Sequence, residues 1–133
     1  GLSLEKIGKN WYQNLLDKTN EAIIAGAKII MQARFLAGEI TCICDVVKLV
    51  GNKEIDLYEI KSSSGPKPYH EHDLAFQCLV LEDSGYKVRN AYVIHVNSDY
   101  VRKGKINVKE LTCIADVTDN VKERLEFTKK LFL

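Results

Sequence analysis

The sequence predicts a single α/β domain, in which a mixed central β-sheet is flanked by helices in the order α-β-β-β-α-β. Three observations predict this fold. Helix-like and strand-like segments alternate along the chain in that order. Gly51-Asn52, a turn signal, separates two strand-like segments and predicts an antiparallel hairpin. The chain has 133 residues and is 46% hydrophobic, enough for one sizeable core and too little for two ordinary domains.

The first half of the chain predicts a helix, three strands and a loop. Residues 4–26 are predicted to be helical, with a break at Thr19, which would cap a second helix, as an alternative. A first strand is expected over 27–37, with Gly38 in the turn after it. The hairpin strands are expected over 40–50 and 54–63, and the segment SSSGPKP that follows is a loop by composition.

The second half predicts a helix, a strand, a short extended segment and a final helix. From His70 to Asp83, Leu74, Cys78 and Leu81 recur at helical spacing. NAYVIHVN (90–97) predicts a strand that is buried on both faces, and VKELTCIADVT (108–118) a short strand. Asp119 or Asn120 is expected to cap the last helix.

Three charged residues interrupt the apolar hairpin strands. Asp45 lies within TCICDVV, and Glu59 and Lys61 lie within LYEIKSS. Burying an unpaired charge is costly, so such residues persist in a core when they are paired or when they bind a metal. Two carboxylates that hold a hard divalent cation, with a lysine beside the phosphate, are what a metal-dependent phosphodiesterase requires.

Strand geometry predicts that these three residues are close together. Side chains alternate along a strand, so Glu59 and Lys61 should project from one face of the sheet. Asp45 is expected to share a face with Ile43 and Val47, and a hairpin that turns at Gly51-Asn52 would bring it towards Glu59. The alternative is an ordinary cross-strand ion pair on a solvated face.

In its motifs the chain resembles the PD-(D/E)XK nuclease superfamily, and most closely its RecB-like branch, which includes CRISPR-associated exonucleases and bacterial domains of unknown function. The matching residues are Asp45, Glu59 and Lys61, followed by HDLAFQCLVLEDSGY, in which Gln77 takes the place of the helix glutamine of that branch. AYVIHVNSDYVRKGKI and IADVT are also similar to the bacterial subgroup, and the resemblance spans about residues 19–120.

The resemblance implies a restriction-endonuclease-like core and metal-dependent hydrolysis of nucleic acid, with DNA as the expected partner, RNA as an alternative and exonucleolytic action. It implies that Asp45, Glu59 and the Ile60 carbonyl bind Mg²⁺ or Mn²⁺. Lys61 would position or deprotonate the attacking water, and Gln77 would orient a phosphate or water. Glu21 is a further candidate ligand, and the alternative for it is an acid that complements a helix N-terminus.

Two other functions compete with an active nuclease. One is a catalytically weak module that keeps the nuclease fold to bind nucleic acid or dock a partner. The other is a structural sheet domain in which Asp45, Glu59 and Lys61 form ion pairs. The presence of all three residues favours the enzyme over the first alternative.

Other polar residues have ordinary explanations. His70, His72 and Asp73 are expected on a solvated helix face, and His95 is expected to be a satisfied core histidine. The hydroxyls and amides of Ser62–Gly65 could contact phosphate, although such residues are common in loops. Seven basic residues are candidates for a nucleic-acid groove, although each alone is more often a surface charge: Arg34, Lys67, Lys87, Arg89, Arg102, Lys103 and Lys105.

The cysteines predict an intracellular chain, and the balanced charge argues against one class of function. Cys42, Cys44, Cys78 and Cys113 have apolar neighbours and lack a late cluster, so we expect buried reduced thiols in a cytoplasm and no iron–sulfur cluster. The formal net charge of +1 argues against a protein that coats polyanions. Neither a signal peptide nor a membrane span is recognisable. The chain lacks an initial Met, and we expect it to be part of a longer protein.

Overall fold

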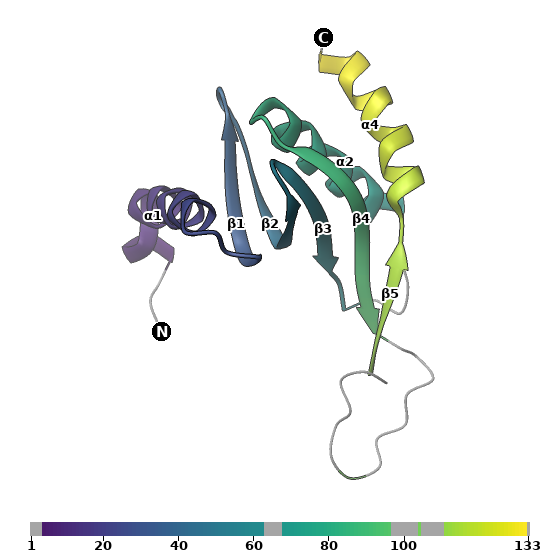
Figure 1. Ribbon diagram of the computed structural model, residues 1–133, viewed down its shortest axis with the longest axis horizontal. Coiled ribbons are helices and arrows are strands. Elements are labelled where there is room, and N and C mark those ends of the chain that lie inside the picture. The colour runs from purple at the N-terminus through teal and green to yellow at the C-terminus, as the bar shows by residue number, and fades with distance from the viewer. Residues whose placement is uncertain (1–3, 63–67, 97–103, 105–110, 133) are drawn as a thin grey trace.

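A computed structural model describes residues 4–62, 68–96, 104 and 111–132 (Figure 1). None of the helices in this part of the chain is long and apolar enough to cross a membrane. The elements follow in chain order: α1 (Leu4–Ile24), β1 (Ile29–Ala37), β2 (Ile40–Gly51), β3 (Glu54–Ile60), α2 (Pro68–Asp83), β4 (Lys87–Val96), β5 (Thr112–Asp116) and α4 (Thr118–Phe132).

The strands form one sheet in the order β1-β2-β3-β4-β5. β3 and β4 pair in parallel, and the other neighbouring strands are antiparallel. Parallel neighbours need a crossover connection, and α2 lies in the connection between β3 and β4. The predicted α/β class, with a mixed sheet flanked by helices, is confirmed.

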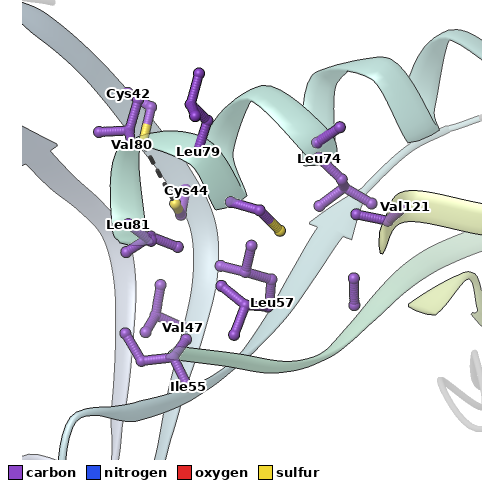
Figure 2. Packing of buried hydrophobic residues seen from close by; sticks show 14 of the residues in the cluster. Cys42, Cys44, Val47, Ile55, Leu57, Leu74, Leu79, Val80, Leu81 and Val121 are labelled. Atoms are coloured by element: carbon purple, nitrogen blue, oxygen red, sulfur yellow. Dashed lines mark hydrogen bonds between the residues drawn. The ribbon is translucent and has the colours of Figure 1, made fainter. Parts of the chain in front are cut away.

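The core lies between one face of the sheet and the helices α2 and α4, which also pack against each other (Figures 1 and 2). Val47, Ile55 and Leu57 point from the sheet towards Leu74 and Val121 of the two helices, and all five side chains are almost fully buried. Burying each such side chain contributes roughly 1.5–3 kcal/mol. This layer fixes α2 over the sheet and with it the position of Gln77.

α1 runs unbroken through Thr19, so the predicted break and second cap at this residue are wrong. The Thr19 hydroxyl donates to the Leu15 carbonyl at 2.8 Å, which satisfies it inside the helix. It also accepts a 3.0 Å hydrogen bond from the Arg34 amide of β1. α1 therefore lies beside the edge strand β1 (Figure 1) and covers part of an edge that could otherwise pair with another chain.

α2 ends in a left-handed glycine turn that returns the chain to the sheet. Gly85 has a φ of 95°, and its amide donates to the Glu82 carbonyl at 3.0 Å. The Tyr86 amide donates to the Leu81 carbonyl at 2.9 Å. These two bonds satisfy the last carbonyls of the helix and direct the chain into β4.

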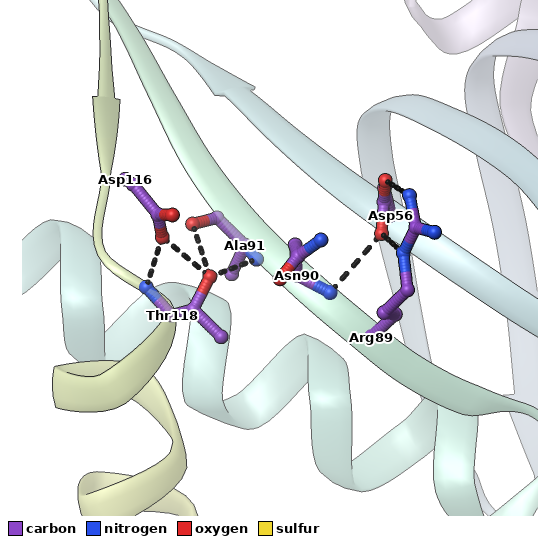
Figure 3. A network of polar contacts seen from close by, with 6 residues as sticks. All are labelled: Asp56, Arg89, Asn90, Ala91, Asp116 and Thr118. Carbon is purple, nitrogen blue, oxygen red and sulfur yellow. Dashed lines mark hydrogen bonds and ion pairs between the residues drawn. The ribbon is translucent and has the colours of Figure 1, made fainter.

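Two predicted turns and caps are displaced along the chain. Gly51 is the last residue of β2, and the turn is formed by Asn52 and Lys53, the latter with a φ of 61°. The last helix begins at Thr118 instead of being capped by Asp119 or Asn120. The reason is that the Asp116 carboxylate accepts a 3.0 Å hydrogen bond from the Thr118 amide, which satisfies a donor at the helix start (Figure 3).

β4 begins at Lys87, earlier than predicted, and is interrupted by a bulge. Val88 pairs with Ile55 and Asn90 with Asp56, so Arg89 is an extra residue in the ladder. Only one face of β4 is fully buried, which corrects the prediction of burial on both faces.

The buried Asp56 carboxylate holds this bulge (Figure 3). It accepts hydrogen bonds from Arg89 Nε at 3.1 Å, Arg89 Nη2 at 2.7 Å and the Asn90 amide at 3.1 Å. Because Asp56 is 2% exposed, these partners compensate for the loss of its hydration.

Candidate active site

Asp45 and the β3 terminus meet where regular strand pairing ends. The regular pairing of β2 with β3 reaches Val46 opposite Tyr58, and continuing this register by one residue places Asp45 opposite Glu59. At this point a side chain replaces the backbone partner: the Ile60 amide donates a 2.8 Å hydrogen bond to Asp45 Oδ2. The hairpin therefore brings Asp45 to the Glu59-Ile60-Lys61 segment, as the sequence predicts.

The alternation of side chains between the two faces of β2 is interrupted next to Asp45, which changes the direction of its side chain. Cys42, Cys44 and Val47 are all buried, so β2 changes phase between Cys44 and Val47, and the predicted common face for Ile43, Asp45 and Val47 is wrong. β1 changes phase at the same level, where Gln32 has a φ of 53° and no pairing with Asp45. Irregular strand geometry of this kind often redirects a side chain next to a functional site.

Glu59 is the centre of a small polar network. Its Oε2 accepts a 2.8 Å hydrogen bond from Gln77 Nε2 of α2, and its Oε1 lies 3.2 Å from Lys61 Nζ. The Glu59 side chain is 9% exposed and that of Lys61 is 29% exposed. The network thus has a buried side at Gln77 and a side open to solvent at Lys61.

Glu59 is a buried carboxylate that lies beside a second carboxylate, Asp45. Burial is the main cause that raises the pKa of Glu59 above its ordinary value, and the charge of Asp45 raises it further. The hydrogen bond from Gln77 and the charge of Lys61 act in the opposite direction and do not cancel the increase. A site of this kind favours either a proton or a cation between the two carboxylates.

Lys61 remains a cation. Desolvation lowers its pKa, but the charge and hydrogen bond of Glu59 outweigh that effect, and Asp73 and Asp45 raise the pKa further. Asp73 lies one helical turn before Gln77 on α2. Asp73 was predicted to lie on a solvated helix face. It is exposed there, and the i, i+4 spacing to Gln77 was the available signal of its proximity to Lys61.

Ile60 and Glu21 have different positions relative to this cluster. The amide and carbonyl of one residue in an extended strand point to the same side, so the Ile60 carbonyl faces the side of β2 and Asp45. Glu21 is exposed in the last turn of α1, which packs against β1 and not against β3. The structure does not bring Glu21 to Glu59, and its expected place near a helix N-terminus is wrong.

The donor set of the described residues fits a hard divalent cation. Asp45 and Glu59 supply carboxylate oxygens, and the Ile60 carbonyl is the kind of oxygen that Mg²⁺ and Mn²⁺ accept. Of the two Asp45 carboxylate oxygens, Oδ2 accepts a hydrogen bond from the described residues and Oδ1 does not, so Oδ1 can serve as a metal ligand. No group of three or more His, Cys, Asp or Glu side chains that could hold a metal occurs in this part of the chain, so water or phosphate would complete the coordination.

The prediction of a solvated helix face is wrong for His70 and correct for His72. His70 is fully buried, with its ring edge-on to Tyr69 at 4.3 Å, and so it does not lie on a solvated face. His72 is exposed and lies 3.1 Å from an Arg124 nitrogen. His95 is half-buried at the end of β4, where Nδ1 is 3.3 Å from the Val96 carbonyl.

The basic and phosphate-loop candidates are only partly described. Arg34 lies on β1, whereas Lys87 and Arg89 both lie on β4, where Arg89 is paired with the buried Asp56. Lys67, Arg102, Lys103, Lys105 and residues 63–65 lie outside the described residues.

Among the cysteines, Cys42, Cys44 and Cys78 are buried as predicted, whereas Cys113 is half-buried, and all four are free thiols.

Comparisons with protein-family models, with curated proteins and with solved structures give no match.

Proposed function

We propose that this protein is a metal-dependent nuclease that hydrolyses DNA phosphodiester bonds, with a restriction-endonuclease-like core and exonucleolytic action. The observation that carries the proposal is the meeting of Asp45 with the Glu59-Ile60-Lys61 segment. Two carboxylates, a lysine and a glutamine from three elements converge there. The same residues carry the resemblance of the sequence to the PD-(D/E)XK superfamily.

Each residue has a distinct role in this proposal. Asp45, Glu59 and the Ile60 carbonyl hold Mg²⁺ or Mn²⁺, which supplies charge neutralisation at the scissile phosphate. Lys61, on the solvent side of Glu59, orients the attacking water and, because it remains a cation, can deliver a proton but not accept one. Gln77 contacts Glu59 in the structure, so its first role is to fix the orientation of that carboxylate.

The main competing function is a nucleic-acid-binding or docking module with little activity. One observation favours it: both Glu59 oxygens already have protein partners, Gln77 and Lys61. A closed network of this kind also stabilises a sheet without any metal. For the nuclease, Lys61 must release Oε1 or share it when the cation binds.

Labelled linear single-stranded DNA, linear duplex, circular duplex and RNA, each with and without Mn²⁺, test the proposal. The expected result is Mn²⁺-dependent shortening of linear DNA, little cleavage of the circle, and loss of cleavage in Asp45→Asn. Lys48→Ala, which removes an exposed charge from the same strand, should retain activity. Binding of DNA without cleavage in Mn²⁺ would favour the binding module, and selective cleavage of RNA would replace DNA as the substrate.

A further inference from the structure

Cys42 and Cys44 form a close pair of thiols on β2, directly before Asp45. Their Sγ atoms are 3.9 Å apart, and both side chains point into the core beneath α2 (Figure 2). Residues i and i+2 of an extended strand have Cα atoms about 6.6 Å apart, since the rise is about 3.3 Å per residue. This separation lies at the upper end of the range of about 4.4–6.8 Å that disulfides span. The Cβ atoms of such residues point to the same face and are about as far apart as the Cα atoms, beyond the separation of about 3.5–4.5 Å that a disulfide requires, so the bond can form only if the strand bends.

The two thiols differ in character. The hydrogen bond with Cys44 lowers the pKa of Cys42. Cys42 is 8% exposed, whereas Cys44 is fully buried. This is the arrangement of an attacking thiolate with a resolving thiol next to it. Burial raises the pKa of the nearby Cys78 to about 12, which keeps that group protonated.

Cys44 is also linked to the candidate active site. It immediately precedes Asp45, at the point where β2 loses its alternation. Closing the sulfur–sulfur distance from 3.9 Å to a bond of about 2.05 Å requires the Cys42–Cys44 backbone to bend. The bend acts on the residue whose carboxylate holds the Ile60 amide.

We propose that Cys42 and Cys44 form a reversible intrastrand disulfide, and that its closure withdraws the Asp45 carboxylate from the Ile60 amide. This is a redox-sensitive modification site, and its formation does not depend on the proposed nuclease activity. Inhibition of DNA cleavage by the disulfide does rest on that proposed function.

The chemistry requires a two-electron oxidant such as a hydroperoxide. The Cys42 thiolate attacks the peroxide oxygen, the O–O bond breaks, and a sulfenic acid forms as water leaves after protonation. The Cys44 sulfur then attacks the sulfenic sulfur, and a second water leaves as the S–S bond forms. Two thiols and one hydrogen peroxide thus give one disulfide and two waters, and a small dithiol reverses the reaction by exchange.

The experiment compares wild-type protein after hydrogen peroxide with the same protein after dithiothreitol. Peptide mapping with alkylation identifies the bonded cysteines, and hydrogen exchange measures the Ile60 amide. We expect a Cys42–Cys44 bond in the oxidised sample and about tenfold faster exchange at Ile60, as for loss of one hydrogen bond. Cys78→Ser should behave like wild type, whereas in Cys42→Ser the peroxide should leave Ile60 exchange unchanged.

Three results would overturn the inference. They are alkylation of both Cys42 and Cys44 after peroxide, a bond from either to Cys78 or Cys113, and a Cys42–Cys44 bond with unchanged Ile60 exchange. Peptide mapping and exchange use wild-type protein, so they decide the question even if a variant fails to fold. DNA cleavage is measured separately on the oxidised and the reduced sample. Absence of cleavage by the reduced protein would count against the proposed function alone.

Discussion

The Ile60 amide donates a 2.8 Å hydrogen bond to Asp45 Oδ2, so the residue between Glu59 and Lys61 is tied to the aspartate of the neighbouring strand. This bond replaces a backbone partner at the end of the β2–β3 ladder. It keeps the Asp45 charge close enough to raise the pKa of Glu59.

The first prediction concerns metal binding. A cation held at a concentration of 100 times its Kd stabilises the folded state by about 2.7 kcal/mol, which raises the Tm of a domain of this size by on the order of 10 °C. We expect Mn²⁺ to produce such an increase in wild type and little or none in Asp45→Asn. Glu39→Gln removes an exposed acid from the β1–β2 turn and serves as the control. Equal increments in all three proteins, measured by scanning calorimetry, would remove Asp45 from the ligand set.

The second prediction separates Lys61 from the metal ligands. An ammonium group cannot coordinate a cation, so Lys61→Ala should retain Mn²⁺ binding. It should lose cleavage by roughly 10²–10⁴-fold, as expected for one general acid–base group. Single-turnover cleavage and calorimetric titration measure the two effects. A variant that cuts at the wild-type rate would show that Lys61 has no catalytic role.

The third prediction concerns the protonation of Glu59. Its pKa is raised above the ordinary 4.5, chiefly by burial, so the folded state binds a proton more tightly than the unfolded state does. Its contribution to stability is therefore fully present below pH 4.5 and is lost as the pH rises through the raised pKa. Mn²⁺ affinity should increase over the same interval, because the cation requires the ionised carboxylate.

Carbon-13 NMR titration of the Glu59 carboxyl measures this pKa directly. The pKa should fall in Asp45→Asn, which removes a neighbouring negative charge, and rise in Lys61→Ala, which removes a positive one. An unchanged pKa in Asp45→Asn would mean that the two carboxylates do not interact.

The fourth prediction tests the strand irregularity opposite Asp45. Gln32 has a φ of 53°, where a β-branched side chain is strongly disfavoured. We expect Gln32→Val to reduce the free energy of unfolding by about 1–2 kcal/mol more than Met31→Val, at the adjacent exposed position. Urea denaturation compares the two variants, and Gln32→Gly should be no less stable than wild type. Equal losses for the two valine variants would argue against a left-handed backbone at Gln32.

Particular residues show what sequence reasoning can and cannot reach. The hairpin and the convergence of Asp45, Glu59 and Lys61 were predictable, because a turn signal and charges within apolar runs are local patterns. The phase change at Gln32 and Asp45 was not, since it depends on two strands that distort together. Thr19 was misinterpreted as a cap because one of its two hydroxyl bonds, which it accepts from the Arg34 amide of β1, forms only in the folded chain.

The central claim is that Asp45 and Glu59 together hold one divalent cation. Anomalous diffraction from a crystal grown with Mn²⁺ tests this claim most directly. The account predicts a Mn²⁺ peak with carboxylate oxygens of both Asp45 and Glu59 as ligands, at about 2.0–2.6 Å. A crystal with Mn²⁺ bound only elsewhere, or with the Lys61–Glu59–Gln77 network closed and no peak beside Asp45, would contradict it.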